Sequence, residues 1–127
     1  MSEHDEQVAL FEWAAWQVNL GVEPLRWLFA IPNGGLRNKA TAGKLKAEGV
    51  KAGVPDVMLP FPSQNYNGLF IEMKFGNNKP TPKQIEWLAW LNGMNYQAKV
   101  ARGFEEAKQI IEDYLLGLGE PYAQTNE

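Results

Sequence analysis

The chain has 127 residues, of which 45% are hydrophobic and 21% charged, and its formal net charge is −3 at pH 7. These values are typical of one globular domain and exclude a disordered chain. The absence of cysteine excludes disulfides and thiolate metal centres, and a single histidine, His4, excludes a histidine-rich metal site. No apolar run approaches the ~20 residues of a transmembrane helix, so we expect a cytoplasmic protein with no membrane partner.

The first half of the chain combines one long apolar segment with a basic one. The expected elements are a helix over 5–20, a short strand over 26–31, a turn over 32–35, a short helix over about 40–48 and a second strand over 55–61. Gly21 and Gly49 are suitable stops for the two helices. The first helix is apolar on most sides, so we expect it to be well buried.

The second half of the chain has clearer sequence signals for the ends of helices and strands. The expected elements are a loop over 62–68, a strand over 69–75, a loop over 76–80, a helix over 81–93, a strand over 96–102, a helix over 104–117 and a frayed tail over about 118–127. Thr81 is placed as an N-cap, Pro82 as the first helical residue, and Gln84 completes a capping box. The sequence therefore predicts a single α/β domain over residues 1–127, with a mixed sheet flanked by helices on both faces.

The charges are unevenly distributed along the chain. Residues 26–83 hold nine lysine or arginine residues against three acidic ones, whereas the remainder is acidic. A basic middle segment can attract a polyanion while acidic flanks maintain solubility. Solvated surface lysines would give the same pattern, so charge alone leaves both interpretations open.

The strand expected at residues 69–75, LFIEMKF, has two charged residues inside an apolar run. Alternate residues of a strand share a face, so one face is apolar throughout and the other is mixed. The apolar face consists of Leu69, Ile71, Met73 and Phe75, and the mixed face of Phe70, Glu72 and Lys74. Charged side chains in such an apolar run are expected to have either an ion-pair or hydrogen-bond partner or a functional role. We expect the apolar face to hold the strand onto a helix.

Asp56 opens the preceding strand, and a hairpin would bring it beside Glu72 and Lys74. Two converging carboxylates suit Mg²⁺, which prefers oxygen ligands and keeps several waters. A nearby lysine can orient a water or stabilise developing negative charge. The set is therefore equipped for metal-assisted hydrolysis of a phosphate ester. The alternative is a buried ion pair of Lys74 with Glu72 or Asp56, although such pairs add little net stability.

Two of these motifs, GVPD at 53–56 and IEMK at 71–74, match the pattern of the PD-(D/E)xK nucleases. Together with IPNGG, TAGKLKAEGVKAGVPDVMLP, GLFIEMK and TPKQIEWL, they closely resemble the virus-type replication-repair nuclease (VRR-NUC) domain in its short stand-alone phage and bacterial form. The resemblance covers about residues 5–116.

The resemblance implies a restriction-endonuclease-like fold with an α-β-β-β-α-β core, and DNA cleavage that depends on Mg²⁺ or Mn²⁺. It implies that Asp56, Glu72 and the backbone carbonyl of Met73 are metal ligands and that Lys74 is the catalytic lysine. Family members also carry a glutamine on the helix after the lysine, which Gln84 matches, and an acidic residue on the first helix. For the latter, Glu6 fits best and Glu12 is a rival.

The resemblance also implies that the chain resolves four-way (Holliday) DNA junctions as a homodimer. Trp87 and Trp90 lie three residues apart on one expected helix, and they could serve a dimer interface or pack in the core. We expect the basic stretch to contact the DNA backbone, through Arg37, Lys39, Lys44, Lys46 and Lys51. Two alternatives stay open: a non-catalytic DNA-binding module of this fold, and a nuclease for other DNA structures or RNA.

Overall fold

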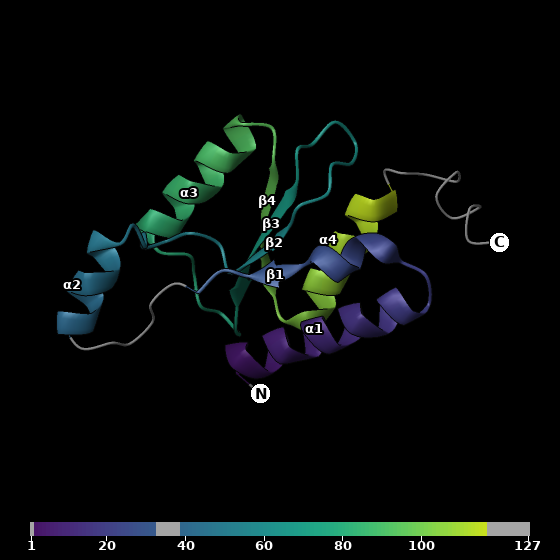
Figure 1. The fold of residues 1–127 in the computed structure, drawn as a ribbon, viewed down its shortest axis with the longest axis horizontal. Helices are drawn as coiled ribbons and strands as arrows, with labels where there is room; N and C mark the ends of the chain where they lie inside the picture. The colour runs from purple at the N-terminus through teal and green to yellow at the C-terminus, as the bar shows by residue number, and fades with distance from the viewer. Residues whose placement is uncertain (1, 33–38, 117–127) are drawn as a thin grey trace.

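A four-stranded mixed sheet forms the centre of the computed structural model, which describes residues 2–32 and 39–116 (Figure 1). In chain order the elements are α1 (Glu3–Asn19), the 3-10 helix η1 (Glu23–Trp27), β1 (Phe29–Ala30), α2 (Lys39–Ala47), β2 (Val57–Leu59), β3 (Leu69–Lys74), α3 (Pro82–Gly93), β4 (Gln97–Arg102) and α4 (Phe104–Leu116). The predicted order of helices and strands and the α/β class are confirmed. Within the described ranges, no helix has the length and apolar character needed to cross a bilayer.

The strands lie side by side in the order β1-β2-β3-β4. β1, β2 and β3 are successively antiparallel, with Val57 opposite Ile71 in the predicted hairpin, whereas β3 and β4 are parallel. A parallel pair needs a crossover connection, and α3 provides it. β3 is thus a central strand with a neighbour on each side, and all six of its residues are buried.

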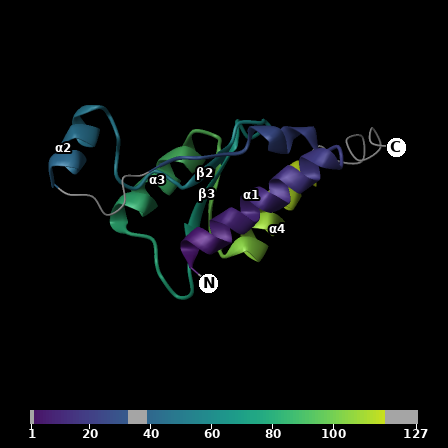
Figure 2. The same ribbon diagram turned by 60° about the horizontal axis from the view of Figure 1, so that its bottom comes forward.

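The alternation of β3 divides the interior into two layers, as the sequence predicts. Leu69, Ile71 and Met73 face α1 and α4, and with these helices they form the larger core. Phe70 faces α3, where it packs in a smaller core with Leu91 and Ala98. Figures 1 and 2 show α1 and α4 together on one side of the sheet, α3 on the other, and α2 standing apart from the sheet near the start of α3.

The helix ends follow local sequence closely. α3 begins with the predicted capping box: the hydroxyl of Thr81 accepts from the N–H of Gln84, and the Gln84 side chain accepts from the N–H of Thr81. Gly21 and Gly49 follow α1 and α2 with φ of 103° and 98°, which a residue with a Cβ rarely adopts. On α4, one stripe faces the larger core, with Ala107, Ile111 and Tyr114 buried in it and Phe104, Ile110 and Leu115 partly buried against it.

Three local predictions are wrong in extent. The expected strand over 26–31 is reduced to Phe29–Ala30, because the segment Glu23–Trp27 forms a 3-10 helix with proline in its first turn. The strand expected over 55–61 is shortened to Val57–Leu59, between two prolines that cannot donate to a ladder. Phe75 lies beyond the end of β3 and is 41% exposed, so it does not hold the strand onto a helix.

Candidate active site

Two carboxylates meet where β2 begins and β3 nears its end. Since Val57 pairs with Ile71 in an antiparallel ladder, the preceding residue, Asp56, lies across from Glu72. The carbonyl of Asp56 accepts from the N–H of Ile31 at 2.7 Å, and its side-chain Oδ2 accepts from the N–H of Met73 at 2.7 Å. Asp56 is therefore held through its backbone carbonyl by Ile31 and through its side chain by β3, as the hairpin predicted from sequence allows.

Glu72 is almost completely buried, with 1% of its surface exposed. Its Oε2 accepts from the side-chain Nε2 of Gln84 at 3.0 Å and lies 3.5 Å from the Nζ of Lys74. Its other oxygen, Oε1, is buried and makes no hydrogen bond to any residue that the structure describes. A buried oxygen left without a partner costs about 1–3 kcal/mol, more if charged, so it calls for a functional explanation.

The surroundings of Glu72 disfavour its charge. Burial raises the pKa of this carboxyl, the neighbouring Asp56 raises it further, and Lys74 only partly opposes them, giving a pKa of about 8. Removing a carboxylate from water and placing a second one beside it both favour the protonated form. A bound cation would reverse the balance, because it stabilises the charged form of both carboxylates.

Lys74 is the other charged residue on this face of β3, and it is 8% exposed. Its contact with Glu72 is the ion pair that the alternative interpretation of the motif predicts. The pair accounts for one oxygen of Glu72 only. It explains neither the unpartnered Oε1 nor the second carboxylate at Asp56. The arrangement is thus more than a structural ion pair.

Gln84 reaches the site from the first turn of α3. Its Oε1 accepts from the N–H of Thr81 at 2.8 Å, and its Nε2 donates to Glu72. Gln84 therefore makes the predicted capping contact and, in addition, a contact with the Glu72 carboxylate that the sequence did not predict. The first turn of α3 also packs closely against Gly53, whose φ is +90°. A Cβ at this position would lie 2.8 Å from the backbone carbon of Lys83, too close for any residue but glycine. The glycine of GVPD thus lets the strand entry pack against α3.

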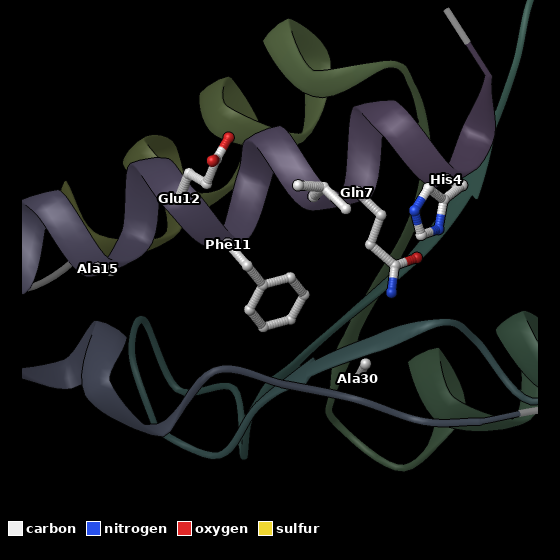
Figure 3. A pocket seen from close by; sticks show the side chains of 7 residues that line it. His4, Gln7, Phe11, Glu12, Ala15 and Ala30 are labelled. Atoms are coloured by element: carbon white, nitrogen blue, oxygen red, sulfur yellow. The ribbon is translucent and has the colours of Figure 1, made fainter.

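Glu6 contacts a different part of the fold. Its Oε1 accepts from the N–H of Phe104 at 2.6 Å, which satisfies a free donor at the start of α4. No group of three or more acidic, histidine or cysteine residues with metal-binding geometry occurs among the described residues. Glu12 is exposed and lines an open cleft between α1 and β1 (Figure 3). A role for either residue in the site stays a prediction.

The basic residues expected at DNA lie on and after α2. Lys44, Lys46 and Lys51 are exposed, on a segment that projects beside the start of α3 (Figure 1). Lys39 is the first residue of α2. Arg37 and most of the expected turn at 32–35 lie outside the described residues.

Sequence reasoning missed Arg102, which pairs with Lys74 in the β3–β4 ladder. Its guanidinium donates to the carbonyls of Gly76 at 2.9 Å and Asn78 at 2.6 Å. These bonds fix the loop that connects Lys74 to α3. No motif marks Arg102, because its partners are backbone atoms 24 and 26 residues away.

The donor set fits a hard divalent cation. Asp56 and Glu72 offer carboxylate oxygens, one of which is buried and has no partner in the described part of the chain. The N–H of Met73 points toward Asp56, and since the N–H and carbonyl of one strand residue point to the same side, its carbonyl faces that side too. Oxygen donors with room for water are what Mg²⁺ and Mn²⁺ prefer.

Comparison with known proteins agrees with this geometry. The family model of the VRR-NUC domain matches residues 4–105. A solved structure described as a VRR_NUC domain protein is 30% identical, with a TM-score of 0.79 over 92% of this chain and 90% of that one. No curated protein matches. The chain belongs to the VRR-NUC domain family, a family of nucleases, and the resemblance and the fold predicted from sequence are confirmed.

The burial of Glu72 leads to a prediction for the metal-free protein. In EDTA at pH 8, we expect Glu72→Gln to raise the free energy of unfolding by about 1–3 kcal/mol, because it removes a buried charge beside Asp56. The pKa of Glu72 rises from 4.5 to about 8 on folding, so the wild-type protein loses stability as pH rises through that window. The advantage of the variant should therefore be small at pH 5 and grow toward pH 8.

Urea denaturation at pH 5, 6.5 and 8 measures this difference. Glu86→Gln is the matched control, since Glu86 is exposed and forms only a 3.9 Å surface pair with Lys83; its effect should stay within about 0.5 kcal/mol at each pH. A Glu72→Gln variant no more stable than wild type at pH 8 would contradict the buried, charge-disfavouring environment.

Proposed function

We propose that this chain is a metal-dependent endonuclease that hydrolyses phosphodiester bonds in DNA, with Mg²⁺ or Mn²⁺ as cofactor. The observation that carries the proposal is Oε1 of Glu72, which is buried beside the carboxylate of Asp56 and has no hydrogen-bond partner among the described residues. A protein that needed these residues only for stability would satisfy that oxygen or replace it. The family membership of the chain independently supports nuclease chemistry.

Each site residue has a defined part in this proposal. Asp56, Glu72 and the Met73 carbonyl would hold the cation, which when bound supplies a polarised phosphate and a water of lowered pKa. Hydrogen bonds from Met73 N–H and Gln84 Nε2 engage one oxygen of each carboxylate and orient the other. Lys74, held near Oε2 of Glu72, would place its ammonium where negative charge develops on the phosphate.

The direct test uses one set of substrates with matched lengths and sequences. Linear duplex, flap and four-way-junction DNA, and a duplex RNA, are each incubated with the protein with and without Mg²⁺. Cleavage of DNA that requires Mg²⁺ and stops with EDTA supports the proposal. Cleavage confined to RNA, or binding to DNA without any cleavage, would overturn it in favour of an RNA nuclease or a non-catalytic module.

The lysines of α2 are proposed to contact the DNA backbone. Each phosphate contact releases counterions, which gives a slope of about −0.9 in log K against log[salt] on duplex DNA. We expect the double variant Lys44→Gln, Lys46→Gln to bind DNA more weakly in EDTA and to flatten this slope by up to about 2. Both side chains are exposed on a helix without acidic residues, so little else should change.

Fluorescence anisotropy at several salt concentrations gives the slope. Lys99→Gln is the control, because Lys99 is also exposed but lies on β4, in register with Ile71 on the face opposite to Glu72. Equal slopes for the double variant and the wild type would mean that these lysines are ordinary solvated side chains.

We also propose that the chain acts as a homodimer on four-way junctions. Resolving a junction needs two symmetric incisions, and a two-fold dimer presents two sites to one substrate. On α3, Trp87 is partly buried against the smaller core, but Trp90 is 62% exposed, one helical turn before the exposed Met94. An exposed tryptophan with apolar neighbours is a suitable interface residue.

Light scattering should therefore give about twice the 14.3 kDa mass of one chain at micromolar concentration. Trp90→Ser should shift the protein toward monomer and reduce paired nicking of a junction, whereas Trp16→Ser, at a tryptophan equally exposed on α1, should not. A wild-type monomer, or equal cutting of junction and linear duplex, would contradict the dimeric resolvase.

A further inference from the structure

The side-chain amide of Gln84 has a donor end and an acceptor end, and only one orientation suits Glu72. With Nε2 toward Glu72, a hydrogen bond of 3.0 Å forms. With the amide rotated by half a turn, Oε1 would face the carboxylate oxygen and repel it. The orientation is set at the acceptor end, where Gln84 Oε1 accepts from the backbone N–H of Thr81 at 2.8 Å. An N–H group can only donate, so it selects Oε1.

We propose that Thr81 is a positioning residue of the active site, acting through its backbone N–H. This inference rests on the proposed metal-dependent function. The N–H of Thr81 fixes the Gln84 amide, the amide holds Oε2 of Glu72, and Oε1 of Glu72 is thereby presented as the oxygen that meets the cation. The capping box of α3 is thus the end of a hydrogen-bond chain that leads to the metal site.

The geometry distinguishes this role from capping alone. A capping box uses the side chain of the third helical residue, here Gln84, only as a hydrogen-bond acceptor. It leaves the NH₂ group of the amide free. Here the donor end reaches a carboxylate that is 1% exposed, at the bottom of the site. Gly53 packs closely against the backbone of Lys83, so the first turn of α3, which carries Gln84, is held in place. Partners that orient ligands typically change metal affinity about 10–100-fold when removed.

Two substitutions at Thr81 separate its backbone from its side chain. Thr81→Ala removes the hydroxyl cap but keeps the N–H. Thr81→Pro removes both, and the φ of −74° at this position suits proline. The comparison of the two variants therefore isolates the N–H. Gln84→Met provides a second route, because methionine keeps the length of the side chain but has no donor for Glu72 and adds no charge beside the cation.

The measurement is Mn²⁺ binding by isothermal titration calorimetry without DNA, with circular dichroism to check the fold. We expect Thr81→Pro and Gln84→Met to bind Mn²⁺ about tenfold more weakly than Thr81→Ala, which should stay near wild type. Cleavage by Thr81→Pro should recover at raised Mg²⁺, and its circular dichroism in EDTA should match that of Thr81→Ala, which an unstable helix would not produce.

Three results would overturn the inference. Equal Mn²⁺ affinity for Thr81→Pro and Thr81→Ala would show that the N–H plays no part. Should Thr81→Pro fail to fold, near-wild-type Mn²⁺ affinity of Gln84→Met would by itself refute the chain of hydrogen bonds from Thr81 to Glu72. If wild-type protein binds no more Mn²⁺ than Asp56→Asn, the metal-dependent function fails, and this inference fails with it.

Discussion

Replacing Glu72 by glutamine should reduce DNA cleavage at saturating Mg²⁺ by about 10³-fold or more. Metal ions contribute several kcal/mol of charge stabilisation in the transition state, and each 1.4 kcal/mol is a factor of ten in rate. Glutamine keeps the shape of the side chain and an oxygen for the Gln84 and Lys74 donors, but it loses the negative charge at Oε1. Asp56→Asn should have a similar effect, since its amide oxygen can still accept from Met73 N–H.

Single-turnover cleavage of a labelled junction gives the rate, and urea denaturation shows that the variants are folded. Because Glu72→Gln is expected to stabilise the metal-free protein, its loss of activity cannot be ascribed to unfolding. Glu86→Gln, at an exposed position on α3, should cleave at the wild-type rate. Cleavage by Glu72→Gln within tenfold of wild type would remove Glu72 from the proposed site.

Replacing Lys74 by methionine should slow cleavage by about 10²–10³-fold, as expected for the loss of one preorganised charge at the reacting phosphate. Methionine fills most of the volume of the lysine stem, so the buried position should tolerate it. Divalent-cation binding should persist, because the substitution removes a positive charge from the neighbourhood of the cation while both carboxylates remain.

Cleavage rate and Mn²⁺ affinity, measured together, distinguish the role of Lys74 from that of the two carboxylates. We expect Glu72→Gln and Asp56→Asn to lose both, and Lys74→Met to lose only the rate. If Lys74→Met instead lost Mn²⁺ binding with little change in rate at high metal, its ammonium would serve to hold Glu72 and would not contact the phosphate.

Local chemistry explains which parts of the fold could be predicted from the sequence. The capping box at Thr81 and Gln84 and the glycine after α1 act within a few residues, so the start of α3 and the end of α1 follow from sequence. The alternation in β3 likewise predicts its two faces, because successive side chains of a strand point in opposite directions. The same alternation put Glu72 and Lys74 on one face, and the expected hairpin added Asp56.

Only the tertiary structure decided how these groups are oriented. That Oε1 of Glu72 is the unpartnered oxygen, that the Thr81 N–H and Glu72 select the orientation of the Gln84 amide, and that Glu6 contacts the start of α4 all depend on contacts between separate elements. The extent of β1 depended on competition between a proline-containing 3-10 turn and strand pairing with β2. Sequence determines which groups are available and which face they share, whereas hydrogen-bond direction and burial arise only when distant segments pack together.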